Sequence, residues 1–262
     1  MIDVHSHIVF EVDDGSKSIE QSLQILHEAR KVGFDTVIVT PHYIEGYYEY
    51  NKNQIAERIN KLQSMQDEVK ILQGNEIYIT ENINELLEEE EASTLADSKY
   101  VLFELPLNAE PLNLMSVVYS ILEKGRIPVL AHPERYPHVQ KDPNTLIELI
   151  ESGVIMQSNY GSILGQYGKE CKKTVQKMLK HNMVHLLGSD VHRPKTVYYN
   201  MPEILKTLEK LIGRNKLEYL TTINPSKMIN NENIEVETPE YIKKGLFAHY
   251  GRSFLGENFI KI

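Results

Sequence analysis

The stretch Ile2-Asp3-Val4-His5-Ser6-His7 decides how the rest of the chain is interpreted. Apolar and polar residues alternate along it, which predicts a short strand that ends in two histidines. Side chains two positions apart in a strand point to the same face, so His5 and His7 present two imidazoles to one point in space. This arrangement suits a divalent metal ion. Two solvent-exposed histidines near a chain terminus are the alternative interpretation.

Beyond this stretch, segments with strand and helix patterns alternate along the chain. Ser18 is a suitable N-cap for a helix that carries Ile19, Leu23, Leu26 and Ala29 along one side. The alternation predicts a parallel sheet, most simply a closed or nearly closed α/β barrel. A length of 262 residues suits one barrel, for which about 250 residues is typical. The seven predicted strands are Ile2–His7, Thr36–Thr40, Val69–Tyr78, Tyr100–Glu104, Ile127–Ala131, Val154–Asn159 and His185–His192, the last breaking into a loop.

Composition and charge argue against several classes of protein. Twenty-eight basic and 37 acidic residues give a formal charge of -9 without a long basic run, so nucleic-acid binding is not expected. No apolar run approaches the roughly 20 residues that cross a membrane, and the start lacks a secretory pattern. The single cysteine, Cys171, excludes an internal disulfide and fits a reducing compartment. We therefore expect a cytoplasmic protein.

Side chains that can bind metal ions follow most of the predicted strands. The C-terminal ends of parallel barrel strands open onto one face, where active sites of this architecture lie. Carboxylates and imidazoles gathered there are costly to bury without cations among them. A set without thiolate suits Mn, Fe or Zn, and its size suits two or three ions, with Glu76 as a natural bridge. The candidate ligands are His5, His7, Asp14, His42, Glu76, Glu104, His132, Asp190 and His192.

The order of these motifs resembles that of the PHP (polymerase and histidinol phosphatase) superfamily over about residues 1–224. Within it, Met1–Ile8 followed by Val12-Asp13-Asp14-Gly15 is similar to the bacterial protein-tyrosine phosphatases of the CpsB/CapC family. The other matching motifs are Pro41-His42, Gly74-Asn75-Glu76, Phe103-Glu104, Ala131-His132-Pro133-Glu134-Arg135-Tyr136 and Gly188-Ser189-Asp190-Val191-His192.

The resemblance implies a fold, an activity and a biological role. The fold is a distorted seven-stranded (βα)7 barrel of the TIM-like PHP type. The activity is hydrolysis of phosphotyrosine by a manganese-dependent cluster of two or three ions, with Fe, Zn or Mg as alternative metals. The implied protein substrate is the tail of a bacterial tyrosine kinase that controls capsule and exopolysaccharide synthesis.

The resemblance also assigns roles to individual residues. One ion is assigned to His5, His7, Glu76 and Asp190, a second to Glu76, Glu104 and His132, and a third to Asp14, His42 and His192. Arg135 matches a phosphate-binding arginine. Arg193-Pro194-Lys195 departs from the expected pattern, so Arg193 and Lys195 are only candidate substrate-binding residues.

Phosphotyrosine suits this chemistry because divalent ions lower the pKa of bound water and a phenolate, with a pKa near 10, leaves readily. His42, His192 or a water molecule is the candidate proton donor. A cluster of tyrosines after the second strand is expected either to stack on the substrate ring or to form a mobile polar loop with incidental aromatics. These tyrosines are Tyr43, Tyr47, Tyr48 and Tyr50.

Several alternatives remain open from the sequence. A histidinol-phosphate or other small-phosphomonoester phosphatase would use the same metals, as would a PHP nuclease, and a metal-stabilised binding module would not turn over substrate. An amidohydrolase would use a lysine carbamate where Glu76 stands. A thiol-dependent phosphatase is disfavoured because Lys177 occupies the position, six residues after Cys171, at which its arginine is expected.

We expect a phosphatase barrel over residues 1–230. Residues 231–262 are expected to form a C-terminal tail that packs on the barrel or on a neighbouring subunit, which leaves a homo-oligomer possible. Its aromatic residues are Tyr241, Phe247, Tyr250, Phe254 and Phe259.

Overall fold

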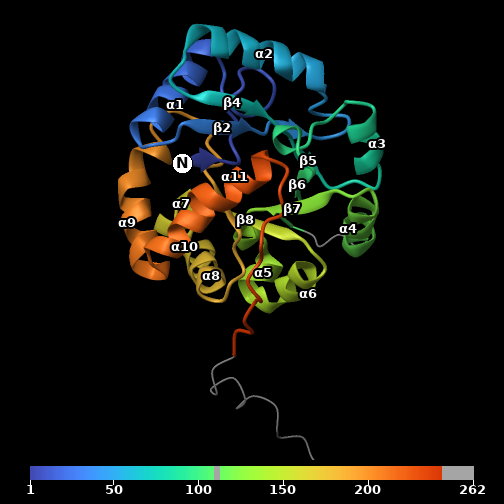
Figure 1. Cartoon of the computed structure of the whole chain (residues 1–262), viewed down its shortest axis with the longest axis vertical. Coiled ribbons are helices and arrows are strands. Elements are labelled where there is room, and N and C mark those ends of the chain that lie inside the picture. Colours follow the sequence, from blue (N-terminus) through green and yellow to red (C-terminus); the bar gives the residue numbers. More distant parts are fainter. Residues whose placement is uncertain (109–112, 244–262) are drawn as a thin grey trace, which may run out of the picture.

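The computed structural model describes residues 1–108 and 113–243, in which every pairing between named strands is parallel (Figure 1). The strands form a three-stranded sheet in the order β1-β2-β4 and a six-stranded sheet in the order β3-β5-β6-β7-β8-β9. Their bounds are β1 Ile2–Asp3, β2 Thr36–Val39, β3 His42–Tyr43, β4 Lys70–Gln73, β5 Glu76–Tyr78, β6 Tyr100–Glu104, β7 Ile127–Ala131, β8 Ile155–Asn159 and β9 Leu186–Gly188. The predicted parallel α/β architecture is thus confirmed.

Helices surround these strands (Figure 1). Helix α1 begins where predicted, with the Ser18 hydroxyl accepting a hydrogen bond from the backbone N–H of Gln21 and with Ile25, Leu26 and Ala29 buried. The α-helices are α1 Ile19–Lys31, α2 Lys52–Met65, α3 Ile83–Glu88, α4 Leu114–Glu123, α5 Pro137–Lys141, α6 Leu146–Glu151, α7 Tyr160–Leu164, α8 Lys169–Lys180, α9 Met201–Ile212, α10 Arg214–Glu218 and α11 Asn224–Ile229. None of the helices described combines the length and hydrophobicity needed to cross a bilayer.

The strand count differs from the seven expected, because the described residues contain nine strands. Residues 69–78, expected as one strand, are divided into β4 and β5 at Gly74-Asn75, and β3 follows β2 across Pro41. Proline has no N–H to donate to a strand ladder. The Pro41 carbonyl instead accepts hydrogen bonds from the Glu76 N–H at 3.1 Å and the Asn75 side chain at 3.0 Å. These breaks separate the strands into two sheets.

The first and last strands lie side by side near their C-terminal ends. Ser6 and Val191 form an isolated parallel bridge. The His7 N–H donates to the Val191 carbonyl at 2.9 Å, and the Asp190 N–H donates to the His5 carbonyl at 2.8 Å. The beginning of the chain is thereby joined to residues almost two hundred positions later.

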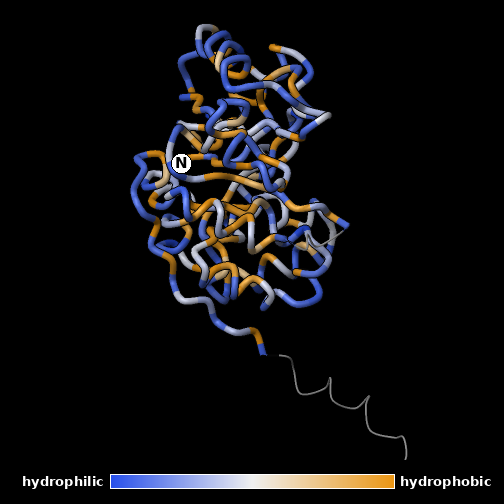
Figure 2. The backbone as a smooth tube through the Cα atoms, turned by 90° about the vertical axis from the view of Figure 1, so that its right-hand side faces the viewer, coloured by the Kyte–Doolittle hydropathy of each residue, from blue (hydrophilic) through white to orange (hydrophobic). Residues whose placement is uncertain are grey.

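Both faces of the central strands are buried. Along β6, Tyr100 and Leu102 belong to one apolar cluster, whereas Val101 and Phe103 belong to the other. Segments of hydrophobic residues accordingly run through the middle of the molecule, and segments of hydrophilic residues lie towards its outside (Figure 2). Burial on two faces explains why these strands have continuous apolar sequences rather than alternating ones.

The described part of the predicted tail, residues 231–243, contacts the body of the protein. The Tyr100 hydroxyl donates to the Glu232 carbonyl at 2.7 Å. Further along, the N–H of Ile242 donates to the Asn144 side chain at 2.8 Å, and the Asn144 amide donates back at 3.0 Å. Tyr241 is exposed, and the predicted contacts of Phe247, Tyr250, Phe254 and Phe259 lie outside the described residues.

Candidate metal centre

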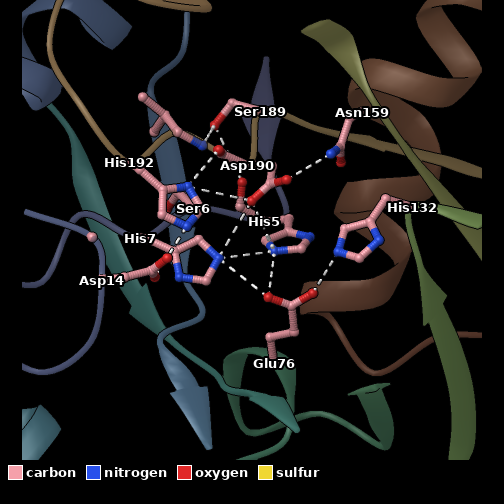
Figure 3. Close-up of polar contacts among 12 residues, drawn as sticks. His5, Ser6, His7, Asp14, Glu76, His132, Asn159, Ser189, Asp190 and His192 are labelled. Carbon is pink, nitrogen blue, oxygen red and sulfur yellow. Dashed lines mark hydrogen bonds and ion pairs between the residues drawn. The ribbon is translucent and has the colours of Figure 1, made fainter. Parts of the chain in front are cut away.

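The nine predicted ligands lie close together, and Figure 3 labels seven of them: His5, His7, Asp14, Glu76, His132, Asp190 and His192. Glu76 begins β5, Glu104 ends β6, and His132 directly follows β7. The ligand atoms fall into overlapping groups, within each of which all atoms lie within 4.8 Å of one another. The groups are His7, Asp14, His42 and His192; His5, His7 and Asp190; His5, Glu76 and His132; and His42, Glu76 and Glu104.

Neighbouring side chains orient the two histidines of the first strand. The Nδ1 atom of His5 lies 2.8 Å from Gln157 Oε1, and the Nδ1 atom of His7 lies 2.7 Å from Asp13 Oδ2. Since these oxygens are acceptors, each Nδ1 carries the proton and each Nε2 presents a lone pair. The two Nε2 atoms lie 3.2 Å apart. The pair predicted from the strand pattern therefore faces one point, as metal ligands do.

Glu76 lies among four of the predicted histidine ligands. Its Oε2 is 3.2 Å from His5 Nε2, His7 Nε2 and His42 Nδ1, and its Oε1 is 2.8 Å from His132 Nε2. Within the described residues, the buried Glu76 Oε2 and His42 Nδ1 form no hydrogen bond of acceptable geometry. Buried atoms of this kind are costly when they lack a partner. Ligand atoms that point at one another without bonding fit a site built around divalent cations.

The electrostatics of this cluster also favour positive charge within it. Burial alone lowers the pKa of His5, but the Glu76 and Asp190 carboxylates together more than reverse this effect and raise it to about 9. Burial raises the pKa of Glu76, and the facing His5 and His42 rings bring it well below its usual range. The carboxylates thus need cationic partners, which are either protons on the imidazoles or divalent metal ions.

The groups agree only partly with the expected assignment of ligands to ions. His5, His7 and Asp190 share a group, as do Asp14, His42 and His192. The expected set of Glu76, Glu104 and His132 is divided: Glu104 groups with His42 and Glu76, and His132 groups with His5 and Glu76. Glu76 connects these two groups, which gives it the bridging position expected of it.

Sequence reasoning missed Asp13, which is buried and organises the first loop. Besides its contact with His7, it accepts hydrogen bonds from the N–H of Gly15 at 2.7 Å and of His42 at 3.1 Å. The family motif Val12-Asp13-Asp14-Gly15 contains both carboxylates, but only Asp14 was predicted as a ligand. A second carboxylate beside a predicted ligand was the available signal, since metal-binding histidines ordinarily donate to such a group.

Arg135 lies beside the predicted ligands and is held by two of its neighbours. Its Nη1 atom is 3.0 Å from Asp190 Oδ2, and its guanidinium carbon lies 4.7 Å from the ring centroid of Tyr167. Burial and the Asp190 carboxylate raise the pKa of Tyr167 well above its ordinary value. The Tyr167 hydroxyl therefore stays protonated at neutral pH and can donate a hydrogen bond. Sequence reasoning did not single out Tyr167.

The two other candidate substrate-binding residues lie elsewhere. Arg193 Nη1 donates to the backbone carbonyls of Asp14, Gly15 and His192 at 2.5–2.7 Å, so it braces the loop that carries Asp14. Lys195 is exposed and lines a different hollow, together with Tyr199. The structure does not bring either side chain into the cavity that contains Arg135.

That cavity, of about 350 Å³, opens beside the predicted ligands. Tyr47 and Tyr48 form part of its rim; the Tyr48 ring is stacked on His42 with centroids 6.1 Å apart, and Tyr47 is 74% exposed. Tyr43 is buried, and Tyr50 contacts Arg58. Two of the four clustered tyrosines therefore face the site. The cavity is lined by Asp14, His42, Ile44, Tyr47, Tyr48, Glu76, Tyr78, Glu104, Leu107, Arg135, Asp190 and His192.

Known proteins are similar in sequence to nearly the whole chain. The chain is 33% identical over 248 residues to the tyrosine-protein phosphatase YwqE of Bacillus subtilis (strain 168), covering 93% of this chain and 97% of that protein. It is 34% identical over 241 residues to the tyrosine-protein phosphatase CpsB of Streptococcus pneumoniae, covering 88% and 99%.

Similarity in structure agrees with similarity in sequence. The fold matches that of a chain from the crystal structures of YwqE from Bacillus subtilis and CpsB from Streptococcus pneumoniae, with a TM-score of 0.87 and 32% sequence identity. The match covers 93% of this chain and 100% of the other. Those two proteins are described as metal-dependent tyrosine phosphatases. The model of the family described as capsular polysaccharide synthesis, CpsB/CapC, matches residues 1–230. The chain therefore belongs to the CpsB/CapC family.

Proposed function

We propose that the protein is a metal-dependent tyrosine phosphatase that acts in capsule or exopolysaccharide synthesis. The observation that carries the proposal is the convergence of nine candidate metal ligands, six of which line one cavity together with Arg135. Relatives that bear the name tyrosine-protein phosphatase, and whose lengths the chain matches almost fully, support the choice of substrate. Capsular polysaccharide synthesis is the role by which the matching family is described.

We propose that manganese is the physiological metal, in two or three sites. The ligand set contains imidazoles and carboxylates without thiolate, which suits Mn, Fe, Zn or Mg better than a soft metal ion. Within this set, Asp14, His42 and His192 would hold one ion, and His5, His7 and Asp190 another. Glu76 would bridge towards Glu104 and His132. When bound, divalent cations supply positive charge and lower the pKa of water for attack on phosphorus.

The protein's own side chains bind and orient the phosphoryl group. The Arg135 guanidinium reaches the cavity and can donate two parallel hydrogen bonds to phosphate oxygens, which fixes the group and offsets its charge. His42 and His192 line the same cavity, and whichever of them does not hold an ion is the candidate proton donor to the leaving oxygen. A tyrosine phenolate, with a pKa of about 10, needs less protonation than an alkoxide does. Hydrolysis therefore demands less of a proton donor with an aryl phosphate than with an alkyl phosphate.

We propose that the protein substrate is the phosphorylated tail of a bacterial tyrosine kinase, encountered in the cytoplasm. The tyrosines at the cavity rim support this choice, because an extended phosphotyrosine peptide can place its ring against Tyr47. Nucleic acid is a poor substrate for a chain with a formal charge of -9. Assembly into a homo-oligomer remains a prediction.

We further propose that the two sheets act as a distorted seven-stranded barrel over residues 1–230, with a separate C-terminal tail. The parallel bridge between Ser6 and Val191 supports closure. If β3 is counted as a continuation of β2, and β5 as a continuation of β4, the nine strands of the described residues correspond to seven barrel strands. The tail contacts at Glu232 and Ile242 support packing on the same subunit.

The decisive experiment measures phosphate release from a phosphotyrosine peptide and from histidinol phosphate. The protein is purified without a histidine tag, its metal content is determined, and it is assayed with Mn²⁺, Zn²⁺, Mg²⁺ and a chelator. We expect Mn²⁺-dependent turnover of the peptide at a higher kcat/KM than that of histidinol phosphate, and loss of this turnover in Glu104→Gln. The reverse preference would assign a small-metabolite phosphatase. Cleavage of an oligonucleotide would assign a nuclease, and metal binding without turnover would assign a binding module.

A further inference from the structure

Tyr167 lies outside the ligand set and contacts two residues of the proposed site at once. It stands in the loop between α7 and α8, between Gly165 and Gly168, whose φ angles are +88° and +99°. Such angles favour glycine, so this loop follows a path that most other residues would resist. The Tyr167 hydroxyl donates to Asp190 Oδ2 at 3.2 Å, and its ring lies under the Arg135 guanidinium at 4.7 Å.

The two oxygens of Asp190 face different partners. Oδ1 lies 3.7, 3.5 and 3.5 Å from ring nitrogens of His5, His7 and His192, on the side of the candidate ligands. Oδ2 accepts hydrogen bonds from Asn159 at 2.7 Å, Arg135 at 3.0 Å and Tyr167 at 3.2 Å. Three donors occupy Oδ2, which leaves Oδ1 to face the metal centre.

The Arg135 side chain is restrained through the same contacts. An arginine side chain loses considerable rotamer freedom when it binds an anion in one geometry. Stacking on an aromatic ring and pairing with Asp190 restrict that freedom in advance. A guanidinium fixed in this way meets a phosphoryl group at a smaller entropic cost.

We propose that Tyr167 is a positioning residue that fixes Arg135 relative to the metal centre, with its ring under the guanidinium and its hydroxyl on Asp190. The inference rests on the proposed phosphatase function, because it assigns Arg135 to phosphate. It adds a residue that is not a candidate metal ligand and reaches substrate only through its neighbours. Phosphate affinity should therefore depend on Tyr167 more strongly than metal content does.

The test compares Tyr167→Phe with Tyr167→Leu in full-length, manganese-loaded protein. Binding of inorganic phosphate is measured by calorimetry, metal content by elemental analysis, and kcat and KM on a phosphotyrosine peptide. The leucine variant removes both the ring and the hydroxyl, so we expect phosphate affinity to fall about tenfold and KM to rise by a similar factor. The phenylalanine variant keeps the ring and should recover most of that loss. Metal content should match the unmodified protein in both.

A double-mutant cycle with Arg135→Lys separates positioning from general destabilisation. If Tyr167 acts through Arg135, the leucine substitution should have little further effect on phosphate affinity in the Arg135→Lys background. Tyr199→Leu is the control, because Tyr199 is 77% exposed and lines a different hollow. It should leave phosphate affinity unchanged.

Each outcome bears on the inference separately from the phosphatase proposal. Unchanged phosphate affinity in Tyr167→Leu overturns it, as do additive effects in the cycle or a loss of metal without a loss of phosphate binding. Failure of the manganese-loaded protein to bind phosphate overturns it as well. Normal phosphate binding that weakens in Tyr167→Leu, combined with absence of phosphotyrosine turnover, would support the positioning role and reject the phosphatase activity.

Discussion

Two buried histidines at opposite ends of the strands experience opposite electrostatic effects. His5 follows β1 at the C-terminal end and faces Glu76 and Asp190, and its pKa is raised to about 9. His185 precedes β9 at the N-terminal end, where burial lowers its pKa to about 4. Its Nδ1 accepts a hydrogen bond from the Met156 N–H at 2.9 Å. Burial is common to both, so the facing carboxylates are what distinguish a candidate metal ligand from a structural histidine.

The largest effect is expected from replacing Glu76, the carboxylate that the histidines of the metal centre face. Glu76→Gln keeps the shape of the side chain but removes the charge that four histidines face. We expect metal content to fall and kcat/KM on a phosphotyrosine peptide to drop by about 10³-fold or more, because metal ions supply most of the charge stabilisation. Elemental analysis and steady-state kinetics measure both. Glu151→Gln, at an exposed position, is the matched control, and retention of full activity in Glu76→Gln would contradict the bridging role.

Removing the carboxylate behind His7 should have a smaller effect. Asp13→Asn weakens the contact that fixes the His7 ring with its Nε2 towards the site. Losses of this kind typically lower metal affinity by about 10–100-fold. Titration of the metal-free protein with Mn²⁺ measures the change, with the exposed Asp67→Asn as a control. Equal affinity in both variants would mean that the orientation of His7 does not depend on Asp13.

The structural histidine, His185, should make the folded protein less stable as the pH falls, which is the opposite of the effect of a histidine whose pKa is raised. His185 is held neutral in the folded protein, with a pKa of about 4 against an ordinary 6.5. Its contribution is fully present above pH 6.5 and is lost as the pH falls towards 4, since the unfolded chain binds the proton first. This loss amounts to about 2 kcal/mol at pH 5. Urea unfolding at pH 7.5 and pH 5 should show it as a difference, with the unmodified protein losing stability relative to His185→Gln between the two pH values.

A matched substitution tests whether this pH dependence comes from burial. His27 is half exposed, so His27→Gln should retain the unmodified protein's loss of stability between the two pH values. An identical loss in His185→Gln would show that other groups cause the pH dependence.

The smallest effect is expected at the cavity rim. Tyr47→Ala removes an exposed ring that packs edge-on against Tyr48, with centroids 4.5 Å apart. We expect KM for a phosphotyrosine peptide to rise about three- to tenfold with kcat nearly unchanged, because the ring contributes to binding alone. KM for a small aliphatic phosphate should stay the same. A parallel rise for both substrates would instead indicate a displaced loop.

The sequence predicted those parts of the molecule in which a local pattern of apolar and polar residues reflects how a strand is buried. Continuous apolar runs such as Tyr100–Glu104 and Ile127–Ala131 match strands that are buried on both faces. Polar residues at the ends of such runs were predicted to converge, and they do. The division at Gly74-Asn75 was missed, because the pattern on either side of it continues as if in one strand.

Contacts between distant loops were beyond prediction. Asn159 reaches Asp190 because β8 pairs with β9, but Tyr167 does so only because the loop after α7 returns to the end of β9, and no spacing in the sequence records this. Arg193 follows the predicted ligand His192 and so suggested substrate binding, whereas its donors are taken by three backbone carbonyls. Residue type and order predicted the candidate ligands, but the orientation of a long side chain depends on tertiary packing.

The pairing of the first strand with the last fixes when the centre can assemble during synthesis. His5 leaves the ribosome before Asp190 and His192, which follow roughly 10 to 40 s later at ordinary translation rates. A nascent chain exposes its first histidines throughout this interval without the carboxylate that completes their group. The complete group of candidate ligands can therefore form only once the later strand has joined the first.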